Sequence, residues 1–267
     1  MAIEVIILLS VIQGFTEFLP ISSSAHLVFL SDLFGGFTSQ RNFDVSLHFG
    51  SLLAVIIYLR IEILKIILDL IYFSKRDKNG VKILLNLLVS TIPIVLFGFL
   101  IHLYDFNIIR SLEIIGWSTL VFGIILGLAD KNLRVKKNLK NLNFKDAFFL
   151  GLAQTLALIP GTSRSGIVIT AGLFMGYSRF DASKYSLLMS IPVILAATTL
   201  ESLSLYKNEG LLINYDMFLG IIISFITALI TIKLFMKWIN NASLKLFVIY
   251  RIILGIVILV YAYNLNY

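Results

Sequence analysis

Long, nearly uninterrupted apolar runs alternate with short polar segments along most of this chain. A helix that crosses the hydrocarbon core of a bilayer needs about 20 mostly apolar residues. Six stretches reach this length, and we expect each to form a transmembrane helix, which predicts an all-α integral membrane protein. The six stretches cover residues 45–68, 83–103, 112–129, 186–205, 217–236 and 246–263.

Two further apolar regions are interrupted by polar breaks near their middle. Residues 2–34 are broken at Pro20, and residues 147–175 are broken at Pro160 and Gly161. Each region then consists of two helices that are too short to span a bilayer comfortably. Irregular backbone at membrane depth is tolerated where it is buried in protein or lines a wet cavity. We therefore interpret each region as a re-entrant helical hairpin; the alternative is a pair of short interfacial helices.

The two halves of the chain share short motifs in the same order. The segment LPISSS begins at Leu19, and IPGTSRS begins at Ile159. The segment FDVS begins at Phe43, and FDAS begins at Phe180. Each half then holds one hairpin and three spans. Because three is an odd number, the second half must be inverted relative to the first, as in many transporter folds.

The predicted organisation is a single membrane domain over residues 1–267, with internal repeats at about 1–130 and 146–267. The distribution of basic residues agrees with the inversion. Segments 60–82 and 130–146 hold 12 of the 22 lysines and arginines. Loops rich in positive charge face the cytoplasm, and the six spans alternate consistently with that rule. The first hairpin then enters from the outer side and the second from the cytoplasmic side, so that their tips meet near the middle of the membrane.

Composition narrows the class of protein further. Hydrophobic residues make up 58% of the chain and charged residues 14%, whereas soluble domains carry about 25% charged residues. This balance excludes a soluble enzyme, a nucleic-acid-binding module and a disordered chain. The net charge of +7 reflects loops that set orientation, and no nucleic-acid partner is expected. The chain has no cysteine, which excludes disulfides, thiolate metal sites and cysteine nucleophiles.

Both hairpin tips place anion-binding groups inside the membrane. Proline is favoured in the first turn of a helix and serine at the N-cap, so we expect new helices to begin just after Pro20 and Pro160. Each tip then directs unpaired N–H groups and a partial positive charge toward the interior. Arg164 adds a guanidinium suited to bidentate contact with phosphate. The sequence therefore predicts an anion site where the tips meet.

The first hairpin also carries a candidate nucleophile and base. Ser22 and Ser23 lie four and three residues before His26, so both hydroxyls can face the imidazole on one side of a helix. This spacing predicts that His26 activates a serine. Ser23 is the preferred nucleophile, and Ser22, His26 itself and water are the alternatives. Glu17, just before the break, is a candidate to orient the histidine, bind a divalent cation or accept a proton.

Two segments carry a family resemblance. QGFTEFLPISSSAH (Gln13–His26) and PGTSRSG (Pro160–Gly166) resemble the two signature motifs of the bacterial undecaprenyl-diphosphate phosphatases of the bacitracin-resistance type. The resemblance implies hydrolysis of undecaprenyl diphosphate to undecaprenyl phosphate and inorganic phosphate, which recycles the lipid carrier for cell-wall synthesis and confers bacitracin resistance. It also implies a multi-pass protein of the bacterial plasma membrane, whose active site opens to the outer, periplasmic side.

The resemblance assigns roles to individual residues. The implied catalytic residues are Glu17, Ser23, His26 and Arg164. The implied substrate-binding residues are Gln13, Ser22, Ser24, Thr162, Ser163 and Ser165. The chain departs from the family at Gln13, where many members have a glutamate, and an amide cannot serve as a base or an anionic metal ligand. Glu17 is then the candidate ligand for a weakly held divalent cation, Mg²⁺ or Ca²⁺, and no organic cofactor is implied.

The architecture leaves a second class of function open. Inverted repeats are typical of transporters, so the alternative is a translocase for polyprenyl phosphate or a transporter of small anions. A nucleophile, a base and a phosphate clamp gathered at the tips favour the enzyme. The expected partners are a polyprenyl diphosphate lipid, the bilayer and a second copy in a homodimer. The isolated His48 and His102 are interpreted as structural or interfacial.

Overall fold

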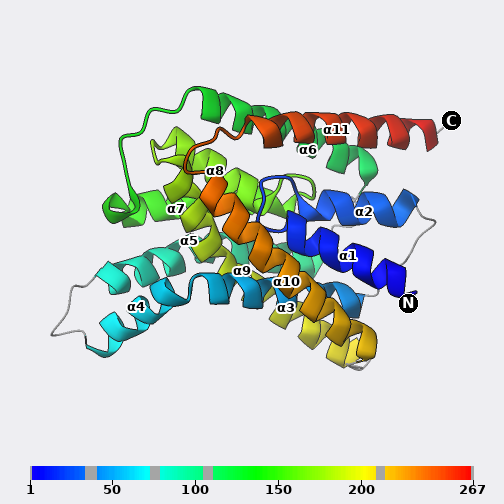
Figure 1. Ribbon diagram of the computed structural model, residues 1–267, viewed down its shortest axis with the longest axis horizontal. Helices are drawn as coiled ribbons and strands as arrows, with labels where there is room; N and C mark the ends of the chain where they lie inside the picture. Colours follow the sequence, from blue (N-terminus) through cyan, green and yellow to red (C-terminus); the bar gives the residue numbers. More distant parts are fainter. Residues whose placement is uncertain (1, 34–40, 73–78, 105–110, 209–213, 266–267) are drawn as a thin grey trace.

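The computed structural model describes residues 2–33, 41–72, 79–104, 111–208 and 214–265. These ranges contain helices and their connections, and no strand (Figure 1). The helices are α1 (Ile3–Thr16), α2 (Ser23–Leu33), α3 (Arg41–Tyr58), α4 (Arg60–Ile71), α5 (Asn79–Tyr104), α6 (Leu112–Lys131), η2 (Leu139–Asn141), α7 (Phe144–Thr155), η3 (Leu156–Leu158), α8 (Arg164–Phe174), α9 (Arg179–Asn208), α10 (Tyr215–Trp238) and α11 (Lys245–Leu265).

Within the described ranges, five helices are long and apolar enough to cross a membrane, namely α5, α6, α9, α10 and α11. They confirm five of the six predicted spans and extend several of them. The helix α9 is the clearest case, because it begins at Arg179, seven residues before the predicted start at 186. The chain is thus an all-α protein with several membrane-spanning helices.

The first predicted span, residues 45–68, is wrong as a single continuous helix. The structure ends α3 at Tyr58 and begins α4 at Arg60, with Leu59 between them at φ −91° and ψ 15°. Two charged side chains next to the interruption make a local and a long-range contact. Arg60 Nη1 donates to the carbonyl of Ile57 at 3.0 Å, and Glu62 pairs with Lys184 of α9 at 2.6 Å. The pairing of Glu62 with α9 depends on tertiary placement, which hydropathy along one span does not reveal.

The two broken regions form as predicted at the level of local structure. Helices α1 and α2 are separated by residues 17–22, which include Pro20. The α7–η3 segment and α8 are separated by residues 159–163, which include Pro160. None of these helices reaches the length of about 20 residues that a span needs. Their placement within a bilayer is taken up under Proposed function.

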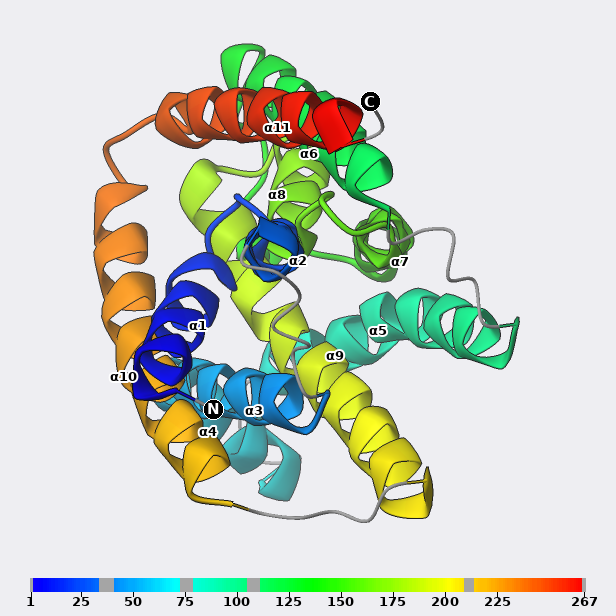
Figure 2. The ribbon, with the colours of Figure 1, turned by 90° about the vertical axis from the view of Figure 1, so that its right-hand side faces the viewer.

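The halves of the chain interlock through their hairpins. The helix α1 packs against α10, and α7 packs against α5, so each broken region lies against a helix from the other half. Close approach requires glycine at both contacts. A Cβ atom at Gly14 would collide with backbone of α10 at Ser224, and one at Gly151 would collide with backbone of α5 at Ser90. Figure 2 shows the result, with α2 and α8 near the middle and α3, α10 and α11 around them.

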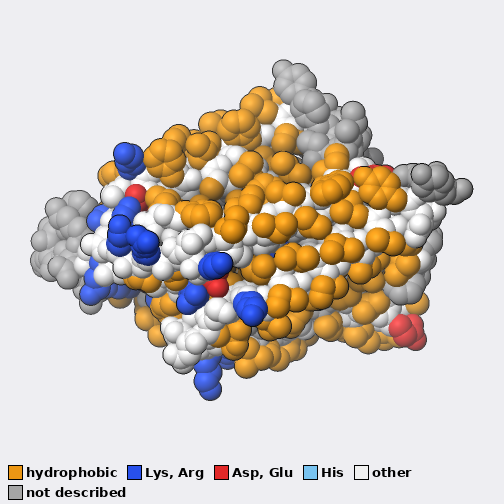
Figure 3. Space-filling model, turned by 90° about the horizontal axis from the view of Figure 1, so that it is seen from above, with side chains coloured by type: hydrophobic (Ala, Val, Ile, Leu, Met, Phe, Trp, Pro, Cys, Tyr) orange, Lys and Arg blue, Asp and Glu red, His pale blue; other side chains and the backbone are white. Residues whose placement is uncertain are grey.

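Apolar and basic side chains occupy different parts of the outer surface. Figure 3 shows hydrophobic side chains covering most of this face, while lysines and arginines gather toward one end. In Figure 1 that end holds the end of α4, the start of α5 and the connection from α6 to α7, while the start of α1 and the end of α11 lie at the opposite end. An apolar belt with basic residues at one end is the surface expected of a membrane protein with a defined orientation.

Candidate active site

The two breaks have the same unusual backbone geometry. Ser22 has φ 73° and Ser163 has φ 68°, and these are the only non-glycine residues with positive φ in the described part of the chain. Each serine caps the helix that follows, since Ser22 Oγ accepts from Ala25 N at 3.3 Å and Ser163 Oγ accepts from Gly166 N at 3.1 Å. Left-handed backbone at residues other than glycine is strained and concentrates at functional sites. The caps place Ser23 and Arg164 at the first helical positions.

Direct contacts join the tips of the two hairpins, as the sequence predicts. Ser165 Oγ donates to the carbonyl of Leu19 at 2.7 Å, and Gly161 N donates to Ser24 Oγ at 3.3 Å. Arg164 Nη2 donates to Glu17 Oε1 at 3.1 Å. The N-termini of α2 and α8 therefore lie beside one another, which concentrates partial positive charge at their junction.

Glu17 is the centre of this junction. The residue is 8% exposed, and its carboxylate accepts hydrogen bonds from three different side chains. Gln13 Nε2 and Ser23 Oγ each donate to Oε2 at 2.9 Å, and Arg164 Nη2 donates to Oε1. A buried carboxylate is tolerated only when it is paired and hydrogen-bonded in this way. The hydroxyl of Ser23 thus lies against a carboxylate rather than an imidazole.

The predicted contact between Ser23 and His26 is absent, and this part of the prediction is wrong. The Nδ1 atom of His26 donates to the carbonyl of Ser22 at 2.7 Å. Its Nε2 atom accepts from the hydroxyl of Tyr250 at 2.6 Å, and the two rings stack with their centroids 5.6 Å apart. Spacing along a helix brings residues to a shared face, but the tyrosine of α11 holds this imidazole on another side. The structure therefore links His26 to the strained turn through the backbone of Ser22.

A second histidine, which the sequence analysis interpreted as structural or interfacial, belongs to the junction. His48 of α3 has Nδ1 2.8 Å from Gln13 Nε2 and 3.6 Å from Glu17 Oε2. A carboxylate can only accept, so the Gln13 atom that faces Glu17 is the amide nitrogen. The same NH₂ group donates its other hydrogen to His48 Nδ1, which leaves the ring proton on Nε2. The only signal in the sequence is an ionisable side chain within an apolar stretch.

A cavity of about 460 Å³ opens beside the junction. Glu17, Ser23, Arg164 and His48 line its polar part, and residues of α5 and α9 supply an apolar wall that includes Ile94 and Val193. Among the predicted substrate-binding residues, Ser22, Ser24 and Ser163 also line the cavity. The other three are buried behind its wall, namely Gln13, Thr162 and Ser165. A polar end with an apolar wall suits an anionic head attached to a hydrocarbon chain.

Comparison with known proteins identifies the family of the chain. Residues 6–257 match the family described as bacitracin resistance protein BacA. The chain belongs to this family. It is 44% identical over 261 residues to the undecaprenyl-diphosphatase of Pelagibacter ubique (strain HTCC1062), which covers 97% of both chains. It is 43% identical over 256 residues to the undecaprenyl-diphosphatase of Alteromonas mediterranea, which covers 95% of this chain and 96% of that one.

The side chains at the site of this BacA-family chain do not offer enough free ligand atoms to hold a divalent cation by themselves. Both oxygens of Glu17 already accept hydrogen bonds from the side chains of Gln13, Ser23 and Arg164. No cluster of three or more histidine, aspartate or glutamate side chains is found within the described ranges. The weakly held divalent cation stays a prediction, and no step below depends on it.

A buried arginine that sequence analysis missed supports the second tip in this BacA-family chain. Arg251 of α11 is 0% exposed, and it donates to the carbonyl of Gly161 at 2.9 Å and to that of Thr119 at 3.2 Å. Within the described residues, no carboxylate pairs with it. Its charge therefore adds to the positive field beneath the N-terminus of α8, and its hydrogen bonds fix the backbone that leads to Arg164.

Proposed function

We propose that this protein hydrolyses undecaprenyl diphosphate to undecaprenyl phosphate and inorganic phosphate, and thereby recycles the lipid carrier used in cell-wall synthesis. The observation that carries the proposal is the junction at which Ser23, Glu17 and Arg164 meet between two helix N-termini, beside a cavity with an apolar wall. The relatives named as undecaprenyl-diphosphatases support the same substrate. Recycling of the carrier accounts for the bacitracin resistance in the family's description.

The proposed reaction begins with attack by Ser23. Its Oγ forms a bond to the terminal phosphorus while the bond from that phosphorus to the bridging oxygen breaks, and the electron pair leaves with undecaprenyl phosphate. Glu17 Oε2, 2.9 Å from Ser23 Oγ, takes the hydroxyl proton as general base. Water then attacks the phosphoserine, Oγ regains its proton from Glu17, and dihydrogen phosphate is released. If water attacks the substrate directly, Glu17 is its base and Ser23 a phosphate ligand.

Charge on the transferring phosphoryl group is stabilised by the two tips. One end of the Arg164 guanidinium is held by Glu17, while its Nη1 atom has no hydrogen-bond partner within the described residues. We assign Nη1 and the helix N-termini to the equatorial oxygens of the terminal phosphate. This stabilisation is preorganised, because Glu17 fixes the guanidinium before substrate arrives.

His48 supplies a further donor in this proposal. Its Nδ1 accepts a hydrogen bond from Gln13, so the proton is on Nε2, on the other side of the ring from Gln13. The ring itself lines the cavity. A neutral imidazole with a fixed proton can donate to a diphosphate oxygen. Gln13 thereby acts as a positioning residue for both Glu17 and His48. An ionised glutamate at position 13 would have no hydrogen to donate to either partner, which gives the amide a physical role.

Replacement of His48 by phenylalanine is expected to lower turnover about 10- to 100-fold, because one phosphate donor is lost. His48→Gln is the matched comparison, since a glutamine retains an acceptor for Gln13 and an N–H group, and it is expected to lose less. Phosphate release by the purified variants measures both. Equal turnover in wild type and His48→Phe would remove His48 from the site.

The same proposal includes a topology of six membrane crossings and two re-entrant hairpins in inverted repeats. We count α3 with α4 as the first crossing. The matched positive φ angles of Ser22 and Ser163 support the repeat, as does the exchange by which α1 packs on α10 and α7 on α5. The homodimer stays a prediction.

We further propose that the basic end faces the cytoplasm of a bacterial plasma membrane and that the cavity opens outward. The cavity includes Asp44 near the start of α3 and Glu201 near the end of α9. These helix ends lie away from the connection between α6 and α7 in Figure 1. Positive charge is retained on the cytoplasmic side, so the opposite end is the periplasmic one.

Single cysteines test the orientation, because the chain contains none. A cysteine at Lys136, which is exposed at the basic end, should react with a membrane-impermeant maleimide only after the cells are opened. A cysteine at Lys207, which is exposed at the end of α9, should react in intact spheroplasts. Labelling of both positions from the same side would contradict the proposed topology.

Phosphate release by purified protein in detergent separates the enzyme from the alternative translocase, because no transport can occur in a micelle. The proposal expects inorganic phosphate from undecaprenyl diphosphate. Binding of the lipid without release would support the translocase and reject hydrolysis. A Glu17→Gln variant is the control for a contaminating phosphatase, since its preparation should release almost none.

A further inference from the structure

A second cavity, of about 500 Å³, lies at the basic end of the molecule and shares no lining residue with the candidate active site. Its walls come from α4, the start of α5, the η2 segment and the start of α9. We refer to it as the basic cavity. Its main lining groups are the lysines Lys65, Lys82, Lys140 and Lys184, the acids Glu62 and Asp181, and the amides Asn79, Asn86 and Asn138.

Positive charge predominates at the basic cavity. Lys65, Lys82 and Lys140 are exposed, so their ammonium groups can move toward a ligand. Lys184 is already held by Glu62 at 2.6 Å. Four lysines against two carboxylates leave an excess of positive charge on the lining groups, which favours an anionic ligand.

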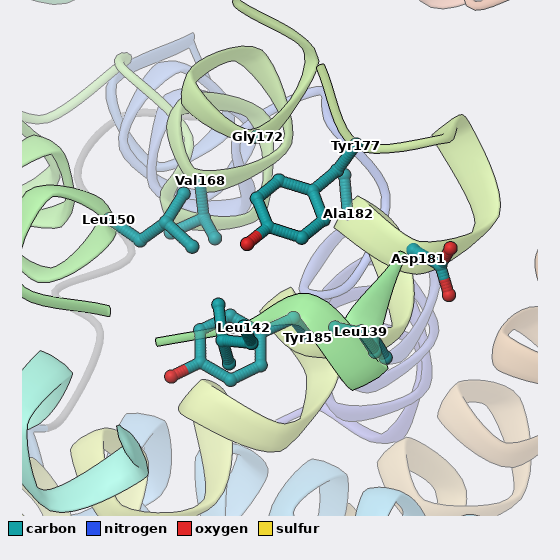
Figure 4. A pocket seen from close by; sticks show the side chains of 9 residues that line it. All are labelled: Leu139, Leu142, Leu150, Val168, Gly172, Tyr177, Asp181, Ala182 and Tyr185. Atoms are coloured by element: carbon teal, nitrogen blue, oxygen red, sulfur yellow. The ribbon is translucent and has the colours of Figure 1, made fainter. Parts of the chain in front are cut away.

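The interior of the basic cavity is apolar. Ile66, Ile83, Leu142 and Leu188 contribute to its wall. Figure 4 shows a mainly apolar pocket next to it, which shares Leu139, Leu142 and Asp181 with the basic cavity, and in which the Asp181 carboxylate points away from the other labelled side chains. A free inorganic anion would make no favourable contact with such an apolar wall. An anion attached to hydrocarbon would use both the lysines and the apolar surface.

One buried polar atom also points to a ligand with hydroxyl groups. Asn86 lines the basic cavity and is 1% exposed. Its amide nitrogen donates to the carbonyl of Leu142 at 3.4 Å, and its Oδ1 atom accepts no hydrogen bond from the described part of the chain. A buried acceptor without a donor costs free energy, so a ligand that brings a hydroxyl would satisfy it.

We propose that the basic cavity binds the headgroup of an anionic phospholipid from the leaflet at the basic end, with the phosphate among the lysines and the acyl chains along the apolar wall. Basic pockets between membrane helices are suited to such headgroups. Phosphatidylglycerol is the probe of choice, because it carries one phosphate charge and free glycerol hydroxyls. The inference does not depend on the proposed hydrolysis, since no residue of the active-site cavity takes part.

The test compares lipid binding by two triple variants of equal charge. Lys65, Lys82 and Lys140 are changed together to glutamine in the first variant. In the control variant, three exposed lysines outside the cavity, Lys131, Lys136 and Lys145, are changed to glutamine. Native mass spectrometry of the full protein, released from mixed micelles with phosphatidylglycerol or phosphatidylcholine, measures bound lipid. Each lysine near a phosphate contributes about fivefold, so the first variant should bind phosphatidylglycerol roughly 100-fold more weakly.

The outcomes separate the possible ligands. The proposal expects wild type and control to prefer phosphatidylglycerol and the cavity variant to lose that preference while its phosphatase activity persists. Equal retention of phosphatidylglycerol by both triple variants would overturn the site. Displacement of the lipid by millimolar inorganic phosphate would assign the cavity to the free anion and overturn the lipid assignment. Absence of phosphate release by the wild-type protein would reject the proposed hydrolysis without bearing on lipid retention.

Discussion

Replacement of Arg164 by lysine should reduce phosphate release about 100- to 1,000-fold, although the positive charge is kept. The Nη2 atom of Arg164 holds Glu17 at 3.1 Å, while Nη1 has no hydrogen-bond partner within the described residues and is the atom proposed to bind the substrate. A lysine has one ammonium group and cannot serve two such partners with planar, forked geometry. The loss should appear mainly in kcat, since the interaction strengthens as charge develops on the transferring phosphoryl group.

Arg179→Lys is the matched control for this substitution. Arg179 also pairs with a buried carboxylate, Asp130, but it lies outside the lining of the active-site cavity. It should keep near-normal turnover. A well-folded Arg164→Lys protein with normal kcat would contradict the assigned role of Arg164.

Substitution of Glu17 by glutamine or Ser23 by alanine should each abolish most turnover, about 1,000-fold or more, and the double variant should be little worse than either alone. Groups that act as one unit in catalysis are strongly non-additive. The 2.9 Å contact between Ser23 Oγ and Glu17 Oε2 makes them such a unit. Kinetics of phosphate release for the two single variants and the double variant measure the coupling directly.

Ser10→Ala is the control for the loss of a buried hydroxyl on α1. Ser10 Oγ donates only to the carbonyl of Ile6 on its own helix, so turnover should stay within about twofold. Losses that simply multiply in the double variant would show that Glu17 and Ser23 act separately. Thermal melting of each variant in the same detergent distinguishes lost chemistry from lost folding.

Much of this fold is predictable from the sequence because the membrane imposes strict local requirements. Long apolar runs have to be helices when no water is present to satisfy their backbone, and five predicted spans are confirmed on that basis. The polar breaks at Pro20 and Pro160 are predictable because proline and serine favour helix starts. The interruption at Leu59 is not, because it accompanies the pairing of Glu62 with a lysine of α9.

The candidate site also has features that the sequence predicts and features that it does not. The approach of Glu17, Ser23 and Arg164 could be predicted from the two motifs, because the predicted inverted arrangement would place both tips together. The orientation of His26 does not follow, since spacing along α2 carries no information about Tyr250 of α11. His48 and Arg251 are isolated side chains in apolar helices, and their partners at Gln13 and Gly161 come from distant parts of the sequence. A single amino-acid sequence contains no local signal for such long-range contacts.

The most direct test of the proposed chemistry is an acid quench during turnover of undecaprenyl diphosphate whose terminal phosphate is radiolabelled. Ser23, at the start of α2 with its hydroxyl on Glu17, is expected to carry the label as phosphoserine, which is stable in acid. The Ser23→Ala protein should carry none. Label on His26 as an acid-labile, base-stable adduct, or substantial turnover by Ser23→Ala without any adduct, would contradict attack by Ser23.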